Sequence, residues 1–312
     1  MTIVQLEYII AVDTHRHFAK AAASCFITQP TLSAQIHKLE EELGVVIFDR
    51  SKQPVIPTAI GERLIEQAKK VVKESKMISN IIAEEKGEIS GVLKLGIIPT
   101  LAPYLLPLFI KRFLEKYPNV NLQIEELVTE DILKRLKDDN LDIGLVVTPL
   151  SEQGILEKPI FYEEFYAYLS KGHTLLNKPD LHIKDLEKGD VWLLQQGHCF
   201  REQVLNLCNK DKQQTQLPNF QYESGSLEGL KRLVDKHDGI TLLPELATLE
   251  LNDGDKARLR SFAGERPTRE VSLVLHRSFL KRKLVDLLYA EILNSLPAGI
   301  SSQKPGQVVK WR

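Results

Sequence analysis

The chain has 312 residues and a formal net charge of −1, with 43% hydrophobic and 27% charged residues. This length exceeds what one hydrophobic core needs and predicts two or three domains. The near-neutral charge gives no indication of a polyanionic partner. Because no run of about 18 apolar residues occurs, no transmembrane helix is expected.

The first residues lack the basic and long apolar stretches of a signal peptide, so we expect a cytoplasmic protein that does not bind membranes. In that compartment the three cysteines should be mostly reduced. A disulfide would therefore be transient and regulatory rather than structural.

Three helices and two short strands are predicted near the N-terminus. Residues 3–14 and 18–24 form the first two helices, the second of which is rich in alanine. Thr28 is a good N-cap for the third, which Gly44 ends. One side of that helix carries an apolar stripe that should be buried: Leu32, Ile36, Leu39 and Leu43. Strands within residues 45–50 and 54–57 would then form a wing.

The other side of the third helix presents small and hydrogen-bonding residues, which suit insertion into the major groove of DNA. The alternative is a plain three-helix bundle with a polar outer face. Residues 1–60 contain five basic side chains and six acidic ones, so the basic surface typical of DNA-binding domains is absent. Residue chemistry alone leaves both interpretations open.

A longer motif favours DNA binding. Residues 21–50 contain Ala21-Ala22-x-x-Cys25-x-Ile27-Thr28-Gln29-Pro30-Thr31-Leu32-Ser33 and continue with Ile36, Leu39-Glu40, Leu43-Gly44, Phe48 and Arg50. This pattern resembles the winged helix-turn-helix of LysR-type transcriptional regulators. The resemblance implies double-stranded promoter DNA and RNA polymerase as partners. It also implies that operator DNA is contacted by Gln29, Pro30, Thr31 and Ser33, and its phosphates by Arg50. Cys25 stands where the family usually has leucine, and we interpret it as a small core hydrophobe.

A long linker helix should follow, from the cap Thr58 to about residue 86. Apolar or small residues recur every three or four positions, as in a coiled-coil seam: Gly61, Ile65, Ala68, Val72, Ser75, Ile78 and Ile82. About 28 helical residues extend about 42 Å, which favours pairing with a second chain. We expect a homodimer, or a homotetramer by resemblance, with residues 59–90 as dimerisation helix and hinge (Gly87, Ser90 and Gly91).

From Gly91 the pattern alternates strands (92–98, 120–126, 141–147) with helices (103–117, 129–138). This predicts an α/β regulatory domain, residues 91–296, with a largely parallel sheet. One subdomain would comprise residues 91–161 and 268–296, with a strand at 271–275 and a helix at 280–296. The other would comprise 162–267, and residues 297–312 would form a flexible tail.

Two α/β lobes joined by a double crossover resemble the periplasmic-binding-protein-like effector domain of LysR-type regulators. Ligands in such folds lie at the carboxyl ends of strands, between the lobes. Thr100 and Thr129 follow the first two strands and would face this cleft. Each threonine could instead simply cap the next helix. A small organic effector in the cleft is one hypothesis for the signal.

Two cysteines, Cys199 and Cys208, offer a different signal. Cys199 lies near an imidazole and a guanidinium, His198 and Arg201, which favour the reactive thiolate. A helix from Cys199 to Cys208 would rise about 13 Å, whereas a disulfide needs Cα atoms roughly 4.4–6.8 Å apart. If the segment is helical when reduced, oxidation must unfold it.

Other chemistry at the cysteines is less well supported. They could be unrelated apolar side chains on an amphipathic helix. No Cys-x-x-Cys motif indicates a thioredoxin-like enzyme, and the eight histidines show no metal-ligand spacing. We therefore expect no metal and no cofactor.

A second resemblance favours the redox interpretation. The motif Gly197-His198-Cys199-x-Arg201-x-Gln203 with Cys208, together with Ile98-Pro99-Thr100 and residues 103–107 and 239–244, resembles the peroxide-sensing branch of the LysR-type family. It implies hydrogen peroxide as signal, Cys199 as peroxidatic and Cys208 as resolving cysteine, and a thiol reductant for reset. The pocket would be formed by Thr100, Thr129, His198, Arg201 and Arg269. For Arg269 a surface ion pair is an equally good interpretation.

A thiol peroxidase is the third hypothesis. It would leave the N-terminal DNA-binding motif unexplained, so we expect a regulator rather than an enzyme.

Overall fold

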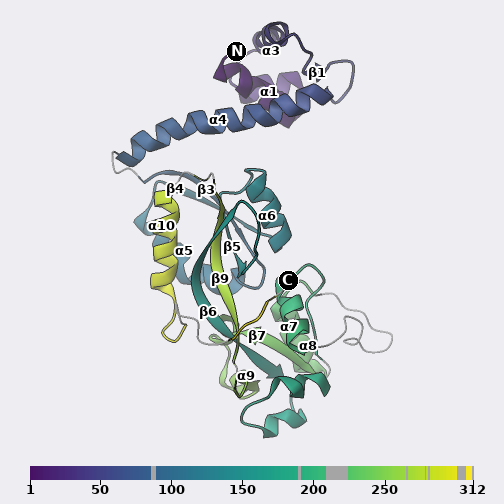
Figure 1. Cartoon of the computed structure of the whole chain (residues 1–312), viewed down its shortest axis with the longest axis vertical. Coiled ribbons are helices and arrows are strands. Elements are labelled where there is room, and N and C mark those ends of the chain that lie inside the picture. Colours follow the sequence, from purple (N-terminus) through teal and green to yellow (C-terminus); the bar gives the residue numbers. More distant parts are fainter. Residues whose placement is uncertain are drawn as a thin grey trace. The chain divides into compact units, whose positions relative to one another are not determined.

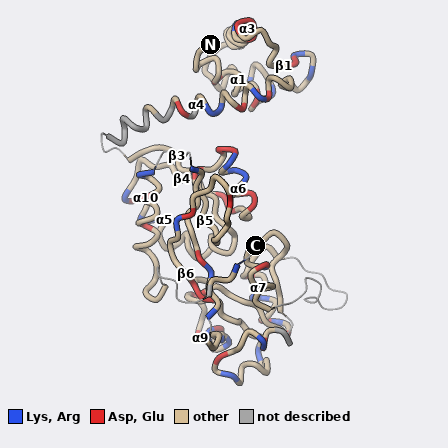
Figure 2. Tube along the Cα trace, in the orientation of Figure 1, with Lys and Arg blue, Asp and Glu red and all other residues tan. Residues whose placement is uncertain are grey.

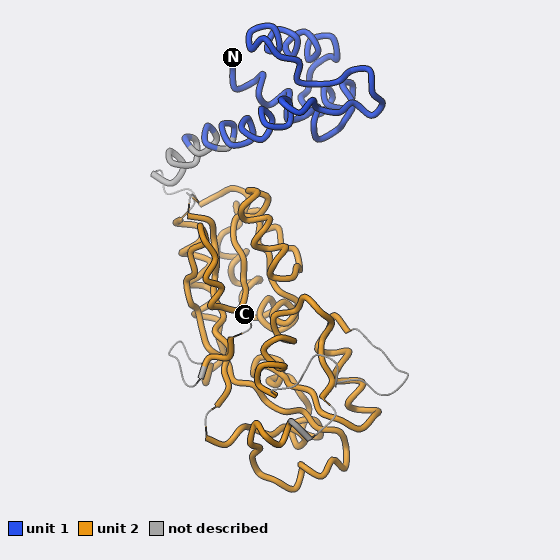
Figure 3. Tube along the Cα trace, turned by 45° about the vertical axis from the view of Figure 1, so that its right-hand side comes forward, with its two compact units in different colours: residues 1–88 blue, residues 89–312 orange. Residues whose placement is uncertain are grey.

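A computed structural model of the chain describes residues 1–85, 89–188, 191–208, 224–264, 266–277, 279, 282–300 and 307–310. The chain divides into two compact units, residues 1–88 and 89–312, which Figure 3 shows in different colours. Within the described residues, no helix is long and apolar enough to cross a membrane.

The first unit begins with the three predicted helices, α1 (Ile3–His15), α2 (Phe18–Ser24) and α3 (Gln29–Leu43). The hydroxyl of Thr28 accepts a hydrogen bond from Thr31 N, and Gly44 ends α3 with a left-handed φ of 67°, which glycine adopts without steric cost. Both predicted caps are therefore confirmed. The predicted stripe is wrong at one position, because the last turn of α3 leaves Leu43 37% exposed.

The wing consists of the antiparallel strands β1 (Phe48–Asp49) and β2 (Ile56–Pro57). A side chain of α3 holds it in place: Glu40 Oε1 accepts hydrogen bonds from the backbone N–H groups of Ile47 at 2.8 Å and Phe48 at 3.3 Å. The first unit thus has the predicted winged helix-turn-helix arrangement.

Helix α4 (Ala59–Glu85) follows the cap Thr58, whose hydroxyl accepts a hydrogen bond from Gly61 N. The first half of the predicted seam packs within its own chain, because Ile65, Ala68 and Val72 are buried in the core of the first unit. The prediction that this stripe meets a second chain is therefore wrong for these positions. Exposed apolar side chains of the described part of α4 are Ile60, Val71 and Ile78. Gly87 and the side chain of Ile82 lie outside what is described.

The second unit is built around strands in the order β4-β3-β5-β9-β6-β7 (Figure 1). Their bounds are β3 Gly91–Ile97, β4 Val120–Glu126, β5 Ile143–Thr148, β6 Ile155–Leu169, β7 Ile240–Pro244 and β9 Pro267–His276. Strand β3 pairs in parallel with β4 and β5, whereas β9, β6 and β7 join antiparallel. Among these six strands, the predicted largely parallel sheet is correct only for β4-β3-β5. A short strand β8 (Leu259–Arg260) pairs with β6.

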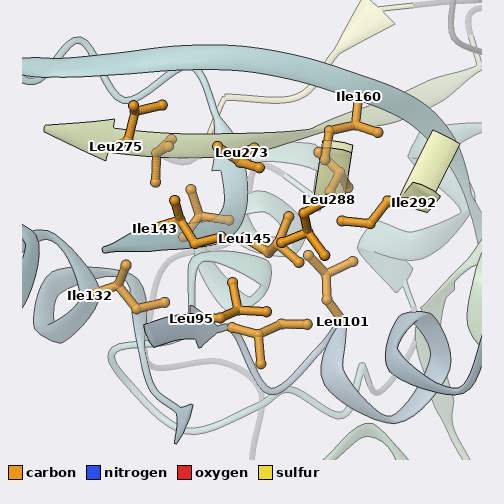
Figure 4. Packing of buried hydrophobic residues seen from close by; sticks show 14 of the residues in the cluster. Leu95, Leu101, Ile132, Ile143, Leu145, Ile160, Leu273, Leu275, Leu288 and Ile292 are labelled. Atoms are coloured by element: carbon orange, nitrogen blue, oxygen red, sulfur yellow. The ribbon is translucent and has the colours of Figure 1, made fainter. Parts of the chain in front are cut away.

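Two hydrophobic cores flank these strands. The first is covered by α5 (Ala102–Lys116), α6 (Thr129–Lys137) and α10 (Arg282–Ser295), and Figure 4 shows part of its packing. The second contains side chains of α7 (Cys199–Cys208) and α8 (Leu227–Lys236). A short helix, α9 (Asp253–Lys256), follows later in the chain. Strand β6 contributes Phe161 to the first core and Phe165 to the second. The α/β class with a winged N-terminal unit is confirmed; α8 and β7 were not predicted.

The end of the chain differs from the expected flexible tail. Residues 307–308 form β10, which pairs in parallel with β9 through Gln307↔Pro267 and Val308↔Thr268. Val309 is only 8% exposed and belongs to the second core. The prediction is wrong for residues 307–310, because backbone pairing and a buried valine hold them. Residues 301–306 and 311–312 lie outside the described part.

The close contact between α4 and the wing gives a prediction. A Cβ on Gly61 would overlap the backbone oxygen of Ile47, whereas Gly→Ala in an ordinary helix stabilises by about 0.5–1 kcal/mol. We expect Gly61→Ala to destabilise the first unit by about 1–3 kcal/mol, measured by thermal or urea unfolding of the whole chain. Gln67→Ala, at an exposed position of the same helix, is the control and should change stability little. A stabilised Gly61→Ala variant would contradict the packing.

Candidate functional site

Helix α7 begins at Cys199 and ends at Cys208, and both cysteines are reduced. The chain turns into the helix at Gly197, whose φ of +97° favours a residue without Cβ. The sequence left open whether this segment is helical when reduced, and the structure shows that it is. With nine residues rising about 13 Å, a Cys199–Cys208 disulfide cannot form unless α7 unfolds.

The two ends of α7 lie in different cores. Cys199, 3% exposed, packs in the first core, whereas Phe200 and Cys208 pack in the second. Phe200 is further held by stacking on Phe165, with ring centroids 5.3 Å apart. Oxidation therefore has to disturb the packing of both cores.

The pKa of Cys199 reflects two opposing effects. Burial raises the pKa of the thiol above its ordinary value, while the charge of Arg269, the hydroxyl of Thr129 and the backbone N–H of Phe200 lower it. Burial is the larger effect, so Cys199 is mainly a thiol at neutral pH. The thiolate would form next to the N-terminus of α7, where backbone N–H groups stabilise negative charge.

Arg269 is the central cation of this site and is fully buried rather than a surface residue. It pairs with Glu163, also fully buried, through Nη2 at 2.8 Å and Nε at 2.9 Å. It also donates to Thr100, from Nη1 to Oγ1 at 2.9 Å and from Nη2 to the carbonyl at 3.1 Å. The guanidinium lies 5.5 Å from the ring centroid of Phe200. Of its two sequence interpretations, the surface ion pair is wrong.

Glu163 was missed by the sequence analysis. It lies in β6 on the same side as Phe161 and Phe165, since alternate residues of a strand face the same way. A single carboxylate among buried apolar positions is the signal that could have revealed it, because a buried charge needs a partner. Its second oxygen accepts a hydrogen bond from Leu246 N at 2.9 Å.

Thr100 and Thr129 are both buried, 2% and 1% exposed. Neither caps a helix, because the N-cap positions of α5 and α6 are Leu101 and Val128. The Thr100 hydroxyl accepts from Arg269 and keeps its own proton for donation. The Thr129 hydroxyl is buried without another hydrogen-bond partner among the described residues, and it lowers the pKa of the Cys199 thiol. Two hydroxyls with unused hydrogen-bonding capacity therefore belong to this site.

His198 and Arg201 act differently from the sequence-based expectation. Burial lowers the pKa of His198, so its imidazole is neutral at pH 7. Arg201 donates from Nη1 to the carbonyl of Leu194 at 2.8 Å, which fixes the segment before α7. The guanidinium that lowers the pKa of Cys199 is that of Arg269, which is distant in sequence.

The remaining candidates lie in the first unit. Cys25 ends α2 and packs, half-buried, against the core of that unit. Gln29, Pro30 and Thr31 are exposed in the first turn of α3, and Ser33 is half-buried one turn on. Among the described residues, no group of three or more His, Cys, Asp or Glu is placed to hold a metal ion.

Arg50 lies beside this face of α3. Its Nη2 pairs with Glu40 at 2.8 Å, its Nη1 donates to Ser33 Oγ at 3.4 Å, and its guanidinium lies 5.2 Å from the ring centroid of Phe18. Figure 2 shows acidic and basic residues interspersed along the chain. Arg50 is thus a cation positioned by contacts with Glu40, Ser33 and Phe18.

Comparison with family models assigns both units. Residues 3–62 match the bacterial regulatory helix-turn-helix protein, lysR family, and residues 86–297 match the LysR substrate binding domain. The chain belongs to the LysR family. Similar members include the hydrogen peroxide-inducible genes activator of Haemophilus influenzae, 34% identical over 88% of this chain and 90% of the relative. The DNA-binding transcriptional dual regulator OxyR of Escherichia coli is 35% identical over 79% and 80%.

Solved structures of LysR-family members show the same fold. A full-length OxyR variant from Pseudomonas aeruginosa superposes with a TM-score of 0.74 at 33% identity, covering 94% of this chain and 98% of that one. A cysteine-to-serine variant of OxyR from Corynebacterium glutamicum, described as bound to hydrogen peroxide, has a TM-score of 0.62 at 28% identity, covering 94% and 92%.

The raised pKa of Cys199 predicts how this LysR-family protein reacts at different pH. Since most of the thiol is protonated at neutral pH, the thiolate fraction should grow roughly tenfold per pH unit. The rate constant for hydrogen peroxide should therefore rise steadily from about pH 6 to about pH 8, measured in Cys208→Ser so that the reaction stops at one cysteine.

Thr129→Val in the same background is a matched comparison. It removes a hydroxyl that lowers the pKa of Cys199, so the rate should be lower throughout this pH range. A plateau of the rate below about pH 8 would mean that the thiol is more acidic than its burial implies.

Proposed function

We propose that this LysR-family protein is a regulator that senses hydrogen peroxide through a reversible Cys199–Cys208 disulfide and controls genes of the oxidative-stress response. The observation that carries the proposal is a buried cysteine at a helix start, beside Arg269 and two hydroxyls, with a second cysteine at the other end of the same helix. The names of the relatives, hydrogen peroxide-inducible genes activators, support it.

The first chemical step consumes one peroxide at Cys199. The sulfur attacks one peroxide oxygen, the O–O bond breaks, and the other oxygen leaves as water after taking up the thiol proton. The product is a sulfenic acid. We assign Arg269 and the hydroxyls of Thr100 and Thr129 to orienting the peroxide and stabilising the departing oxygen. Neutral His198 can supply a hydrogen bond but no charge.

The second step forms the switch. The sulfur of Cys208 attacks the sulfur of the Cys199 sulfenic acid and the S–O bond breaks; the hydroxyl group takes up the Cys208 thiol proton and leaves as water, and a disulfide results. Since the disulfide cannot be accommodated in α7, the helix must unfold and the two cores must repack. A thiol reductant would later cleave the disulfide and allow α7 to reform.

The consequence for transcription follows from the first unit. We propose that a homodimer or homotetramer presents pairs of α3 helices to promoter DNA, with bases contacted by Gln29, Pro30, Thr31 and Ser33 and phosphate by Arg50. Unfolding of α7 would change how the regulatory units associate, and so the spacing of the DNA-binding units and the contact with RNA polymerase. A cytoplasmic location fits reduction of the disulfide between signals.

The central test is a titration of reduced protein with stoichiometric hydrogen peroxide. Mass spectrometry should find one Cys199–Cys208 disulfide, and the footprint on promoter DNA should change. Cys199→Ser should abolish both responses, because it removes the attacking sulfur. Cys25→Ser is the matched control and should behave as wild type, since Cys25 lies in the other unit.

Other results would select other functions. A protein that forms no disulfide and does not respond to peroxide, but changes its footprint with a small organic molecule, would be an effector-binding LysR regulator. Consumption of many equivalents of peroxide in the presence of a thiol reductant, without a footprint change, would indicate a thiol peroxidase.

A separate prediction concerns Arg50. The Arg50 side chain is 39% exposed although its partner Glu40 is mostly buried, so the positioned guanidinium remains accessible to a DNA phosphate. Arg50→Gln should weaken binding to specific and random duplexes alike and reduce the slope of log affinity against log salt by about one, measured by fluorescence anisotropy. Lys111→Gln removes a highly exposed charge from the other unit and should leave both quantities unchanged. A loss restricted to one DNA sequence would instead indicate a base contact.

A further inference from the structure

Residues 307–310, here called the C-terminal segment, lie directly against helix α7 in the second unit (Figure 1). The side-chain amide of Gln203 donates from Nε2 to the carbonyl of Val309 at 2.8 Å. Asn206 donates from Nδ2 to the carbonyl of Lys310, also at 2.8 Å. Both donors lie between Cys199 and Cys208, and both acceptors are backbone atoms.

The other side of the C-terminal segment is held by β9. Strand β10 pairs with residues 267–268 of β9, and Val309 N donates to Thr268 O at 2.8 Å. The next residue of β9 is Arg269, which pairs with Glu163 and lowers the pKa of Cys199 through its charge. The C-terminal segment therefore connects the middle of α7 to the strand that carries the central cation of the site.

This docking depends on α7 being helical. Gln203 and Asn206 are three residues apart, and only a helix places side chains at that spacing on one face. Val309 packs in the second core with Val204 and Cys208 of the same helix. Gln203 is fully buried and its Oε1 has no hydrogen-bond partner among the described residues, so its amide is satisfied mainly through the C-terminal segment.

We propose that the C-terminal segment is a reduced-state clamp: it binds α7 only in its helical form and so opposes disulfide formation. The inference rests on the proposed Cys199–Cys208 switch. It adds that the C-terminal segment shifts the equilibrium between the two thiols and the disulfide. Unfolding of α7 separates the two amides and releases the segment. Because coupling between two events is reciprocal, removing the segment must favour the disulfide.

The expected effect is on an equilibrium: two Cys thiols plus oxidised glutathione give the protein disulfide plus two molecules of reduced glutathione. Two neutral hydrogen bonds at the usual net strength imply a change on the order of tenfold. A chain ending at residue 306 should therefore form the disulfide about tenfold more favourably, a midpoint potential about 30 mV more negative.

Point variants distinguish the loss of the clamp's hydrogen bonds from a non-specific destabilisation of the fold by truncation. Gln203→Met keeps the volume but removes the donor, and should shift the equilibrium in the same direction as the truncation. Lys310→Ala is the matched control: Asn206 bonds the carbonyl of residue 310, so loss of the exposed side chain should leave the equilibrium unchanged. Hydrogen exchange in full-length wild type should show residues 307–310 protected when reduced and unprotected when oxidised.

The outcomes distinguish the two proposals. If wild type forms the disulfide but the truncated chain and Gln203→Met have the same midpoint, or residues 307–310 stay protected in the oxidised form, the clamp is refuted and the switch stands. If wild type forms no Cys199–Cys208 disulfide at any glutathione ratio, the switch is refuted and the clamp with it.

Discussion

The buried ion pair of Arg269 and Glu163 is the constraint on which the regulatory unit depends. Both side chains are fully buried, and removing one partner of such a pair typically costs about 3–5 kcal/mol because a charge is left without compensation. The pair joins neighbouring strands β9 and β6 at the boundary between the two cores, and it orients the hydroxyl of Thr100. The charge that assists Cys199 is thus held by the framework of the fold and not by the residues next to the cysteine.

Burial and charge act on Cys199 in opposite directions, and burial is the stronger effect. A fully exposed thiolate would react more often with any oxidant, whereas a fully apolar pocket would prevent the thiolate from forming. The site lies between these limits, because Cys199 packs against apolar side chains but also lies near the Arg269–Glu163 ion pair and the hydroxyls of Thr100 and Thr129. The same burial ties Cys199 to the first core and Cys208 to the second, so a local reaction at sulfur is linked to the packing of the whole unit.

Much of this could be predicted from local sequence patterns. The caps Thr28 and Gly44 and the strand–helix alternation depend on nearby residues, and they are found as expected. Features that depend on contacts between residues far apart in sequence were not predictable. They are the pairing of Arg269 with Glu163, the packing of Ile65 and Val72 in the core of the first unit, and the docking of residues 307–310. His198 and Arg201 were expected to stabilise the Cys199 thiolate because they are close to it in sequence. Closeness in sequence does not mean that a side chain brings its positive charge to the sulfur. His198 is neutral, and Arg201 is bonded to a carbonyl.

The almost complete burial of Cys199 bears on which molecules such a sensor can report. Cys199 is 3% exposed, so a molecule can reach its sulfur only when neighbouring side chains of the two cores move. A small oxidant needs a smaller displacement of these side chains than a bulky one. Burial of the sulfur therefore selects oxidants by size before any reaction at the thiol, and it shields Cys199 from the electrophiles that attack exposed thiols.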